Sequence, residues 1–92
     1  MQTIWKFELT TTDDQTIEIP LGAEFLTVQV QNNNPCIWAL VDPSQPTEKR
    51  HIEIYGTGHR IHTDIGVERK YIGTYQLNGG SLVFHVFEYL GV

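Results

Sequence analysis

The stretch that decides the fold runs from Tyr71 to Leu90 and reads YIGTYQLNGGSLVFHVFEYL. Its order is a strand-like run, the glycine-rich turn Asn78-Gly79-Gly80 and a second strand-like run, which is the pattern of a β-hairpin. In the second run, residues 82, 84 and 86 share one face and residues 83, 85, 87 and 89 share the other, and both sets are mostly apolar. We therefore expect the last strand to lie inside a sheet and not at its edge.

Alternation with period two, which is typical of strands, continues through most of the chain. The expected strands cover residues 4–9, 16–19, 26–31, 36–41 and 50–55. We expect the second of these strands to form a hairpin with the first. The third strand is expected to turn Leu26, Val28 and Val30 to one face. The fourth strand has no polar residue, so we expect it to occupy the centre of a sheet. Helical spacing is not sustained anywhere. The sequence predicts a single all-β domain over residues 1–92, a small antiparallel sandwich or barrel of about seven strands.

Composition excludes several classes of protein. Hydrophobic residues make up 40% of the 92 residues and charged residues 18%, which is typical of a folded domain. The net charge of −5 argues against nonspecific nucleic-acid binding. The single cysteine, Cys36, has no partner for an internal disulfide, and no apolar run is long enough to span a membrane. The first residues also lack the pattern of a secretion signal, so we expect a cytoplasmic protein of a bacterial host cell.

The segment YGTGHRIH, residues 55–62, is the most suggestive site for a ligand. Gly56 and Gly58 allow the backbone to turn its amides toward an anion, and the histidine and arginine that follow can donate charge-assisted hydrogen bonds. The candidate ligand-binding residues here are Tyr55, Gly56, Thr57, Gly58, His59 and Arg60. The alternative interpretation is a strand-ending turn with solvated charges, because glycine-rich phosphate motifs need a following helix that this sequence does not predict.

Metal binding and catalysis have weaker support. His59 and His62 are three residues apart, but no predicted helix aligns them as zinc ligands, and Cys36 has no second cysteine nearby. His85 falls on the strand expected to be interior, so we expect a core histidine with satisfied hydrogen bonds and not a catalytic base. We expect no metal, no cofactor and no catalytic residue, and leave enzymatic activity open.

Aromatic residues exceed the needs of so small a core. Such side chains are enriched where a protein meets a partner or stacks on a flat ligand. Trp38 is expected in the core, whereas Tyr55, on the polar face of its strand, is expected to be exposed. Because edge strands must be covered and a second copy can cover them, we also expect a homo-oligomer.

Four blocks of the sequence resemble a known family. They are IWKF at 4–7, PCIWALVDP at 35–43, YGTGH at 55–59 and YIGTYQLNGGSLVFHVFE at 71–88. Together they are similar to small proteins encoded by phages and prophage regions, a family without an assigned activity. The resemblance spans nearly the whole chain and implies provenance, not mechanism. The chain departs from the family pattern at residues 60–62, which weakens any ligand contact assigned to Arg60 or His62.

The resemblance implies an accessory factor that binds a component of the host, and two hypotheses follow. In the first, which we rank ahead, a non-enzymatic binding protein sequesters a small anionic, nucleotide-like signal at an oligomer interface. In this hypothesis Arg60 and His59 would contact phosphate, and Thr57 would line the pocket. Tyr55 would contact the base, together with Trp5 from elsewhere in the chain. In the second, the protein inhibits a host defence complex by covering a functional surface of it.

Overall fold

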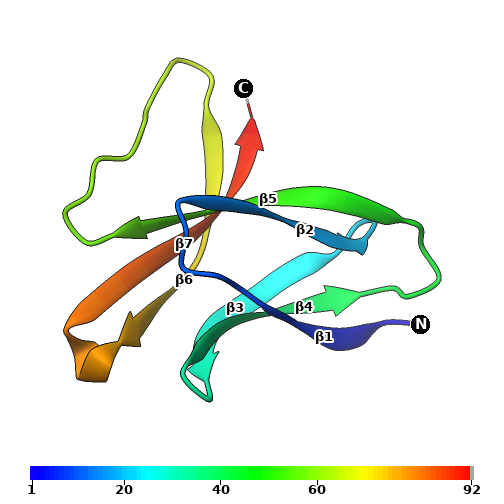
Figure 1. Ribbon diagram of the computed structural model, residues 1–92. Helices are drawn as coiled ribbons and strands as arrows, with labels where there is room; N and C mark the ends of the chain where they lie inside the picture. Colours follow the sequence, from blue (N-terminus) through cyan, green and yellow to red (C-terminus); the bar gives the residue numbers. More distant parts are fainter. Residues whose placement is uncertain (92) are drawn as a thin grey trace.

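A computed structural model describes residues 1–91, which form seven β-strands and one 3₁₀ turn (Figure 1). The elements are β1 (Thr3–Glu8), β2 (Asp14–Pro20), β3 (Glu24–Gln31), β4 (Asn34–Val41), β5 (Thr47–Gly56), β6 (Glu68–Leu77), the 3₁₀ turn η1 (Asn78–Gly80) and β7 (Leu82–Gly91). Within this part of the chain there is no helix long and apolar enough to cross a membrane.

The strands form two antiparallel sheets that pack as a sandwich. One sheet has the order β1-β4-β3 and the other has the order β2-β5-β7-β6. Both sheets of residues 1–91 keep open edges, so the architecture is a sandwich and not a closed barrel. The all-β prediction is confirmed, and so are the central position of β4 and the interior position of β7.

The expected hairpin between the first two strands is wrong. β1 pairs with β4, for example Phe7 opposite Ile37, whereas β2 pairs with β5 in the other sheet. The chain crosses between the sheets just after β1, where the amide of Leu9 donates to the carbonyl of Pro35 at 2.8 Å. Leu9 itself is buried. Polar turn residues permit a crossover between sheets as readily as a tight hairpin, so the turn signal after Leu9 did not specify the pairing.

The core lies between the sheets and contains side chains from six of the strands. Its fully buried members include Ile19, Ile37, Ala39, Val41, Ile52 and Val86. In β3 only part of the expected face is buried, and a register shift between Phe25 and Thr27 turns Leu26 out of that face. Val28 is buried as expected, whereas Leu26 and Val30 are exposed. Trp38 is half-buried, since the alternation of β4 turns it away from the core face of Ile37 and Ala39.

β6 approaches β3 closely at Gly73. A Cβ atom at this position would lie 2.7 Å from Cγ1 of Val28, closer than carbon atoms approach in folded proteins. The absence of a side chain at Gly73 therefore allows the backbone of β6 to pack against a core residue of the other sheet. The register of β6 on β7 also shifts between Tyr71 and Gly73.

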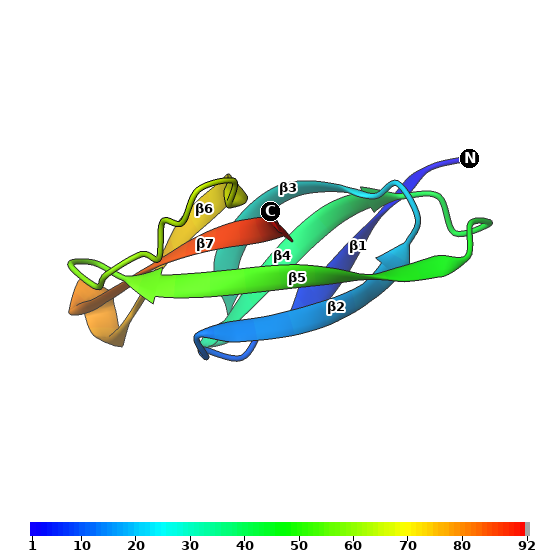
Figure 2. The ribbon, with the colours of Figure 1, turned by 90° about the horizontal axis from the view of Figure 1, so that it is seen from above.

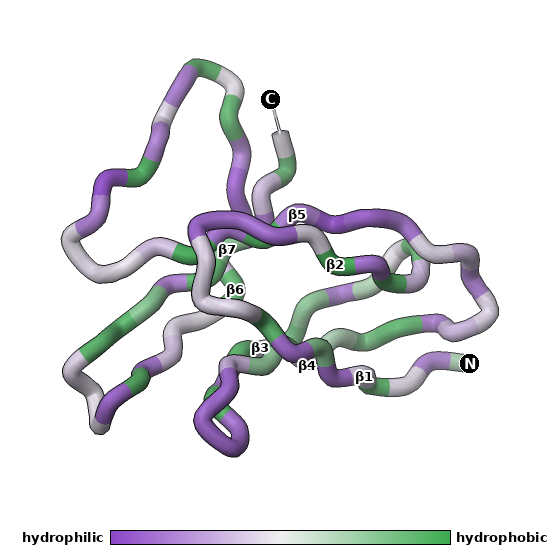
Figure 3. The backbone as a smooth tube through the Cα atoms, viewed as in Figure 1, coloured by the Kyte–Doolittle hydropathy of each residue, from purple (hydrophilic) through white to green (hydrophobic). Residues whose placement is uncertain are grey.

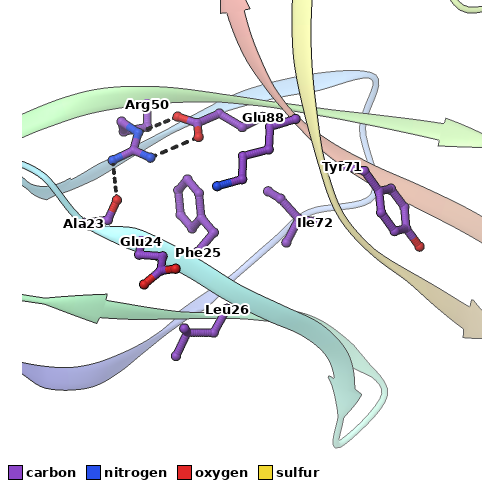
Figure 4. Close-up of a pocket in the computed structure, with 9 residues that line it drawn as sticks. Ala23, Glu24, Phe25, Leu26, Arg50, Tyr71, Ile72 and Glu88 are labelled. Atoms are coloured by element: carbon purple, nitrogen blue, oxygen red, sulfur yellow. Dashed lines mark hydrogen bonds and ion pairs between the residues drawn. The ribbon is translucent and has the colours of Figure 1, made fainter.

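A buried ion pair holds one end of the sandwich. The guanidinium of Arg50 in β5 bonds both carboxylate oxygens of Glu88 in β7, and its Nη1 donates to the carbonyl of Ala23 at 2.9 Å (Figure 4). The ring of Phe25 lies 4.8 Å from the guanidinium carbon. The hydrogen bond to Glu88 is the main reason that the pKa of Arg50 is raised. Because Ala23 comes just before β3, this pair links the two sheets.

The molecule is flat and extended for its length. Its principal extents are 40, 38 and 16 Å (Figure 2). The end of the β6–β7 hairpin that carries η1 projects away from the three-stranded sheet in both ribbon views. The radius of gyration is 13.6 Å, whereas a compact chain of this length would have about 12 Å. The four-stranded sheet therefore extends beyond the sheet that packs on it.

Candidate functional site

The bend Gly56-Thr57-Gly58-His59 ends β5 and is closed by its own hydrogen bonds. The amide of Thr57 donates to the carbonyl of Val83 in β7 at 3.2 Å, and the amide of His59 donates to the carbonyl of Gly56 at 3.0 Å. Gly58 has a φ of +85°, a conformation that favours glycine. Two of the amides that the sequence suggested for an anion are thus used within the protein.

The imidazole of His59 lies directly over Gly56. A Cβ atom added to Gly56 would be 2.8 Å from Cε1 and 2.9 Å from Nδ1 of the ring. Glycine at position 56 therefore provides the space that the ring occupies. His59 is nevertheless exposed to solvent, and within residues 1–91 its ring nitrogens have no hydrogen-bond partner. Both nitrogens remain available to a ligand.

Two cavities adjoin this imidazole. The larger, of about 250 Å³, is lined by Gly56, Thr57, His59, Ser81, Leu82, Val83 and Phe84. The smaller, of about 80 Å³, is lined by Thr11, Thr12, Asp13, Ile54, Gly56, His59 and Phe84. The larger cavity combines apolar side chains from the start of β7 with two hydroxyl groups and an imidazole. This combination suits a flat ring that carries polar groups.

Arg60 begins the long connection from β5 to β6, and its side chain is exposed. This connection is coloured mostly as hydrophilic or neutral, with short hydrophobic segments (Figure 3). The ion pairs found within residues 1–91 do not include Arg60. His62, by contrast, contacts Asp64 at 2.6 Å, and its carbonyl accepts from Arg69 at 2.6 Å. Arg60, which follows His59 in the chain, is therefore a cation that is not neutralised by a carboxylate of the described residues.

Tyr55 belongs to the opposite side of the four-stranded sheet. Tyr55 was expected to be exposed but is half-buried, with its ring 6.0 Å from that of Phe87 and 5.8 Å from the guanidinium of Arg69. Burial, and then the negative charge of Glu53, raise the pKa of Tyr55. Tyr55 is therefore one of a group of packed aromatic residues and does not line either cavity beside His59.

Trp5 is separate from the bend. It lies on β1, in the other sheet, with its ring 6.4 Å from that of Phe7. It is partly exposed but lines neither cavity beside His59. The structure thus brings Gly56, Thr57 and His59 together around the larger cavity. Gly58 and Arg60 do not line this cavity, but they are the neighbours of His59 in the chain.

His85 differs from its sequence prediction. It is half-exposed on the outer side of β7 and is not a core residue. Its Nε2 lies 2.7 Å from Oγ1 of Thr57 and its Nδ1 lies 3.0 Å from Oγ1 of Thr74, so hydroxyl groups and not backbone carbonyls satisfy the ring. An interior strand of a sheet still has one face on the outside of a sandwich, and His85 is on that face.

Sequence reasoning missed the contribution of the β7 start to the cavity. Ser81, Leu82 and Phe84 line the space beside His59, although they are about 25 residues away in sequence. Their only sequence signal was the turn at Asn78, which returns β7 alongside β6 and places the start of β7 next to the end of β5.

Comparison with known proteins identifies the family of the chain. Searches of curated proteins and of solved structures found no match. A family model described as a domain of unknown function, DUF7352, matches residues 1–91. Because the match covers nearly the whole sequence, the chain belongs to the DUF7352 family.

Proposed function

We propose that this protein is a non-enzymatic, phage-type accessory protein that sequesters a small anionic, nucleotide-like ligand of the host at the bend after β5. The observation that carries the proposal is the cavity of about 250 Å³ beside the imidazole of His59. This imidazole has no hydrogen-bond partner among the described residues. A site with an apolar wall, hydroxyl groups and adjacent cationic donors matches the chemistry of a heterocycle linked to phosphate.

The site divides this ligand between two kinds of contact. Phe84, Leu82 and Val83 form an apolar wall on which a flat base can pack. The hydroxyl groups of Thr57 and Ser81, which already bond His85 and the carbonyl of Asn78, can still accept hydrogen bonds from donors of the base or sugar. In this proposal His59, at the end of the bend, and Arg60, the next residue, bond phosphate oxygens, and the exposed guanidinium supplies the positive charge.

The volume of the cavity limits the ligand. Sites that enclose drug-sized ligands have volumes of about 300–1,000 Å³. A cavity of about 250 Å³ suits one base with its adjacent groups, and not a complete dinucleotide. A larger nucleotide signal would therefore extend past the rim of this cavity toward a second subunit, consistent with binding at an oligomer interface.

Isothermal titration calorimetry with a panel of linear and cyclic nucleotides tests the proposal. We expect one or more of them to bind the wild type, and His59→Ala and Arg60→Ala each to weaken binding at least tenfold. Gly56→Ala provides a sharper variant, because its methyl group displaces the imidazole at little cost to the fold. His62→Ala is the matched control, since His62 is a histidine of the same connection that lines neither cavity. Absence of binding by the wild type across the panel overturns the proposal.

The second hypothesis, an inhibitor that covers part of a host defence complex, requires a broad aromatic or acidic surface. The outward side of the four-stranded sheet carries an aromatic surface of this kind, with Tyr71 and Phe87 among its residues.

A further inference from the structure

The outward side of the four-stranded sheet is a regular array of side chains, and we call the part of it on β5, β7 and β6 the outer face. At the edge of this face the outward side continues with Asp14, Thr16 and Glu18 of β2 and Lys49 of β5. Strand pairing places residues of β5, β7 and β6 in neighbouring rows, for example Tyr55 beside His85 and His85 beside Thr74. The outer face consists of His51, Glu53, Tyr55 and Thr57 from the β5 side, Val83, His85, Phe87 and Tyr89 from β7, and Arg69, Tyr71, Thr74 and Gln76 from β6.

The aromatic rings of the outer face pack against one another by their edges. Phe87 is at the centre, with the ring of Tyr55 at 6.0 Å and 77° and that of Tyr71 at 5.5 Å and 64°. Tyr89 is tilted against His51 in the same way. Rings in this arrangement do not present parallel faces on which a base or sugar could stack. A surface rich in tyrosine and phenylalanine, with an arginine among them, is instead typical of contacts between proteins.

The outer face itself is electrically neutral, although the whole chain carries a net charge of −5. Asp14, Glu18 and Lys49 at its β2 edge give the complete outward side of the sheet a net charge of −1. Its two charged residues, Glu53 and Arg69, form an ion pair at 2.5 Å and are 16% and 11% exposed. The guanidinium of Arg69 also lies over the rings of Tyr55 and Tyr89. A nucleic acid or a strongly charged protein would find no opposite charge here. Two copies of this acidic chain, by contrast, repel each other least where they meet through neutral surfaces.

The polar groups of the outer face can pair with copies of themselves. The side chains of Tyr71, Thr74, His85 and Thr57 form one hydrogen-bonded chain, with contacts of 2.5, 3.0 and 2.7 Å. Hydroxyl and neutral imidazole groups both donate and accept hydrogen bonds. A group of this kind can meet the same group of a second molecule across a two-fold axis, which places identical surfaces in contact.

The size of the sheet and the shape of the chain agree with a covered face. The three ten-residue strands of the outer face, spaced about 4.8 Å apart with about 3.4 Å per residue, give about 490 Å² of flat area, and the seven residues of β2 raise this to about 600 Å² before side-chain relief is added. A stable interface buries about 800 Å² on each partner. The chain exposes 5973 Å², whereas a compact monomer of this mass would expose about 5,400 Å².

We propose that the outer face is the surface through which two copies of this chain associate about a two-fold axis. This inference rests on the proposed function for its consequence at the ligand site. Thr57 and Val83 belong both to the outer face and to the lining of the larger cavity, so a second copy would form an additional wall at the rim of that cavity. Dimerisation and ligand binding would then strengthen each other by the same factor.

Sedimentation velocity on the ligand-free protein, from low micromolar to several hundred micromolar concentrations, tests this interface. We expect the wild type to form a dimer of twice 10.5 kDa. Tyr71→Glu should leave a monomer with an unchanged circular dichroism spectrum, because Tyr71 is 55% exposed and contributes little to the core. Ile4→Glu is the matched control: Ile4 is 57% exposed on the other sheet, and this variant should remain a dimer.

Each alternative outcome overturns the inference. A monomeric wild type at the highest concentration excludes self-association, and an oligomer that survives Tyr71→Glu but not Ile4→Glu moves the interface to the other sheet. A monomer that forms a defined complex with a host protein, and loses it on Tyr71→Glu, assigns the outer face to that protein. Nucleotide titration of monomeric Tyr71→Glu separates the two proposals, because a nucleotide that still binds weakly shows that the cavity works without the dimer.

Discussion

Nε2 of His85 lies 2.7 Å from Oγ1 of Thr57, so a residue in the middle of β7 is bonded to the bend that ends β5. The other ring nitrogen of His85 contacts Thr74 of β6 at 3.0 Å. The histidine thereby connects the bend of the candidate ligand site to two neighbouring strands. It gives the bend a side-chain anchor in addition to the backbone bond from Thr57 to Val83.

Thr57→Val should loosen the bend with a small loss of stability. A typical hydrogen bond contributes about 0.5–1.5 kcal/mol, and the lower end applies because the half-exposed His85 can bond water instead. We expect faster hydrogen exchange at the amides of Gly58 and His59, measured by NMR, and a loss of about 0.5 kcal/mol in urea unfolding. Thr63→Val, an exposed threonine in the same connection, should change neither measurement. Unchanged exchange in Thr57→Val would show that the backbone alone holds the bend.

Gly73→Ala should destabilise the sandwich by overpacking. The new methyl group would lie 2.7 Å from Cγ1 of Val28, which is buried in the core. We expect a loss of about 1–3 kcal/mol in the free energy of unfolding, measured with urea. The double variant Gly73→Ala, Val28→Ala should be more stable than the sum of the two single effects predicts, because the second change makes room for the first. Additive effects would place the strain of Gly73→Ala elsewhere.

Arg50→Met should be among the most destabilising changes on β5. It removes the partner of Glu88, which is 4% exposed, and leaves a buried carboxylate without its cation. Breaking a buried pair in this way costs about 3–5 kcal/mol. Glu48→Gln, which alters a more exposed carboxylate 3.6 Å from the same guanidinium, should cost less than about 1 kcal/mol. Replacing both members, as in Arg50→Met with Glu88→Leu, should restore much of the loss, and a failure to do so would contradict this explanation.

The stability of the protein should fall above about pH 10, the ordinary pKa of tyrosine, in part through Tyr75. Burial raises the pKa of Tyr75, while its hydrogen bond to Thr11 partly offsets this effect. Because the unfolded chain releases this proton at lower pH than the folded chain does, its contribution is complete below the unfolded pKa and is lost as pH rises through the folded value. Urea unfolding of Tyr75→Phe between pH 8 and 11 should show a shallower decline than the wild type. Equal slopes would mean that Tyr75 has no part in the alkaline loss.

Much of the fold could be predicted because alternation reports on burial directly. The apolar run of β4 and the two apolar faces of β7 each placed a strand in the interior of a sheet, as the structure has them. Pairing was harder, because the polar residues after Leu9 fit a hairpin and a crossover equally well. Leu26 is exposed because of a register shift, and local sequence does not report where two strands lose their register.

The candidate site was predicted only in part, for a related reason. The glycines at 56 and 58 marked a real bend, and His59 lies beside a cavity there. Trp5 is on the other sheet, and Phe84 and Leu82 enter the site only through tertiary pairing that no local motif encodes. His85 was misplaced because an interior position within a sheet was taken as an interior position within the sandwich.

The interior place of the last strand also constrains how the protein is made. β7 lies between β5 and β6 in the sheet, and it follows both of them in the chain. Until it emerges, β5 has only β2 beside it and β6 has no strand on that side. The four-stranded sheet therefore assembles only once β7 has been made, and its many distant pairings predict slow folding, in the range of milliseconds to seconds. Translation that stops short of residue 82 would leave β5 with an unpaired edge.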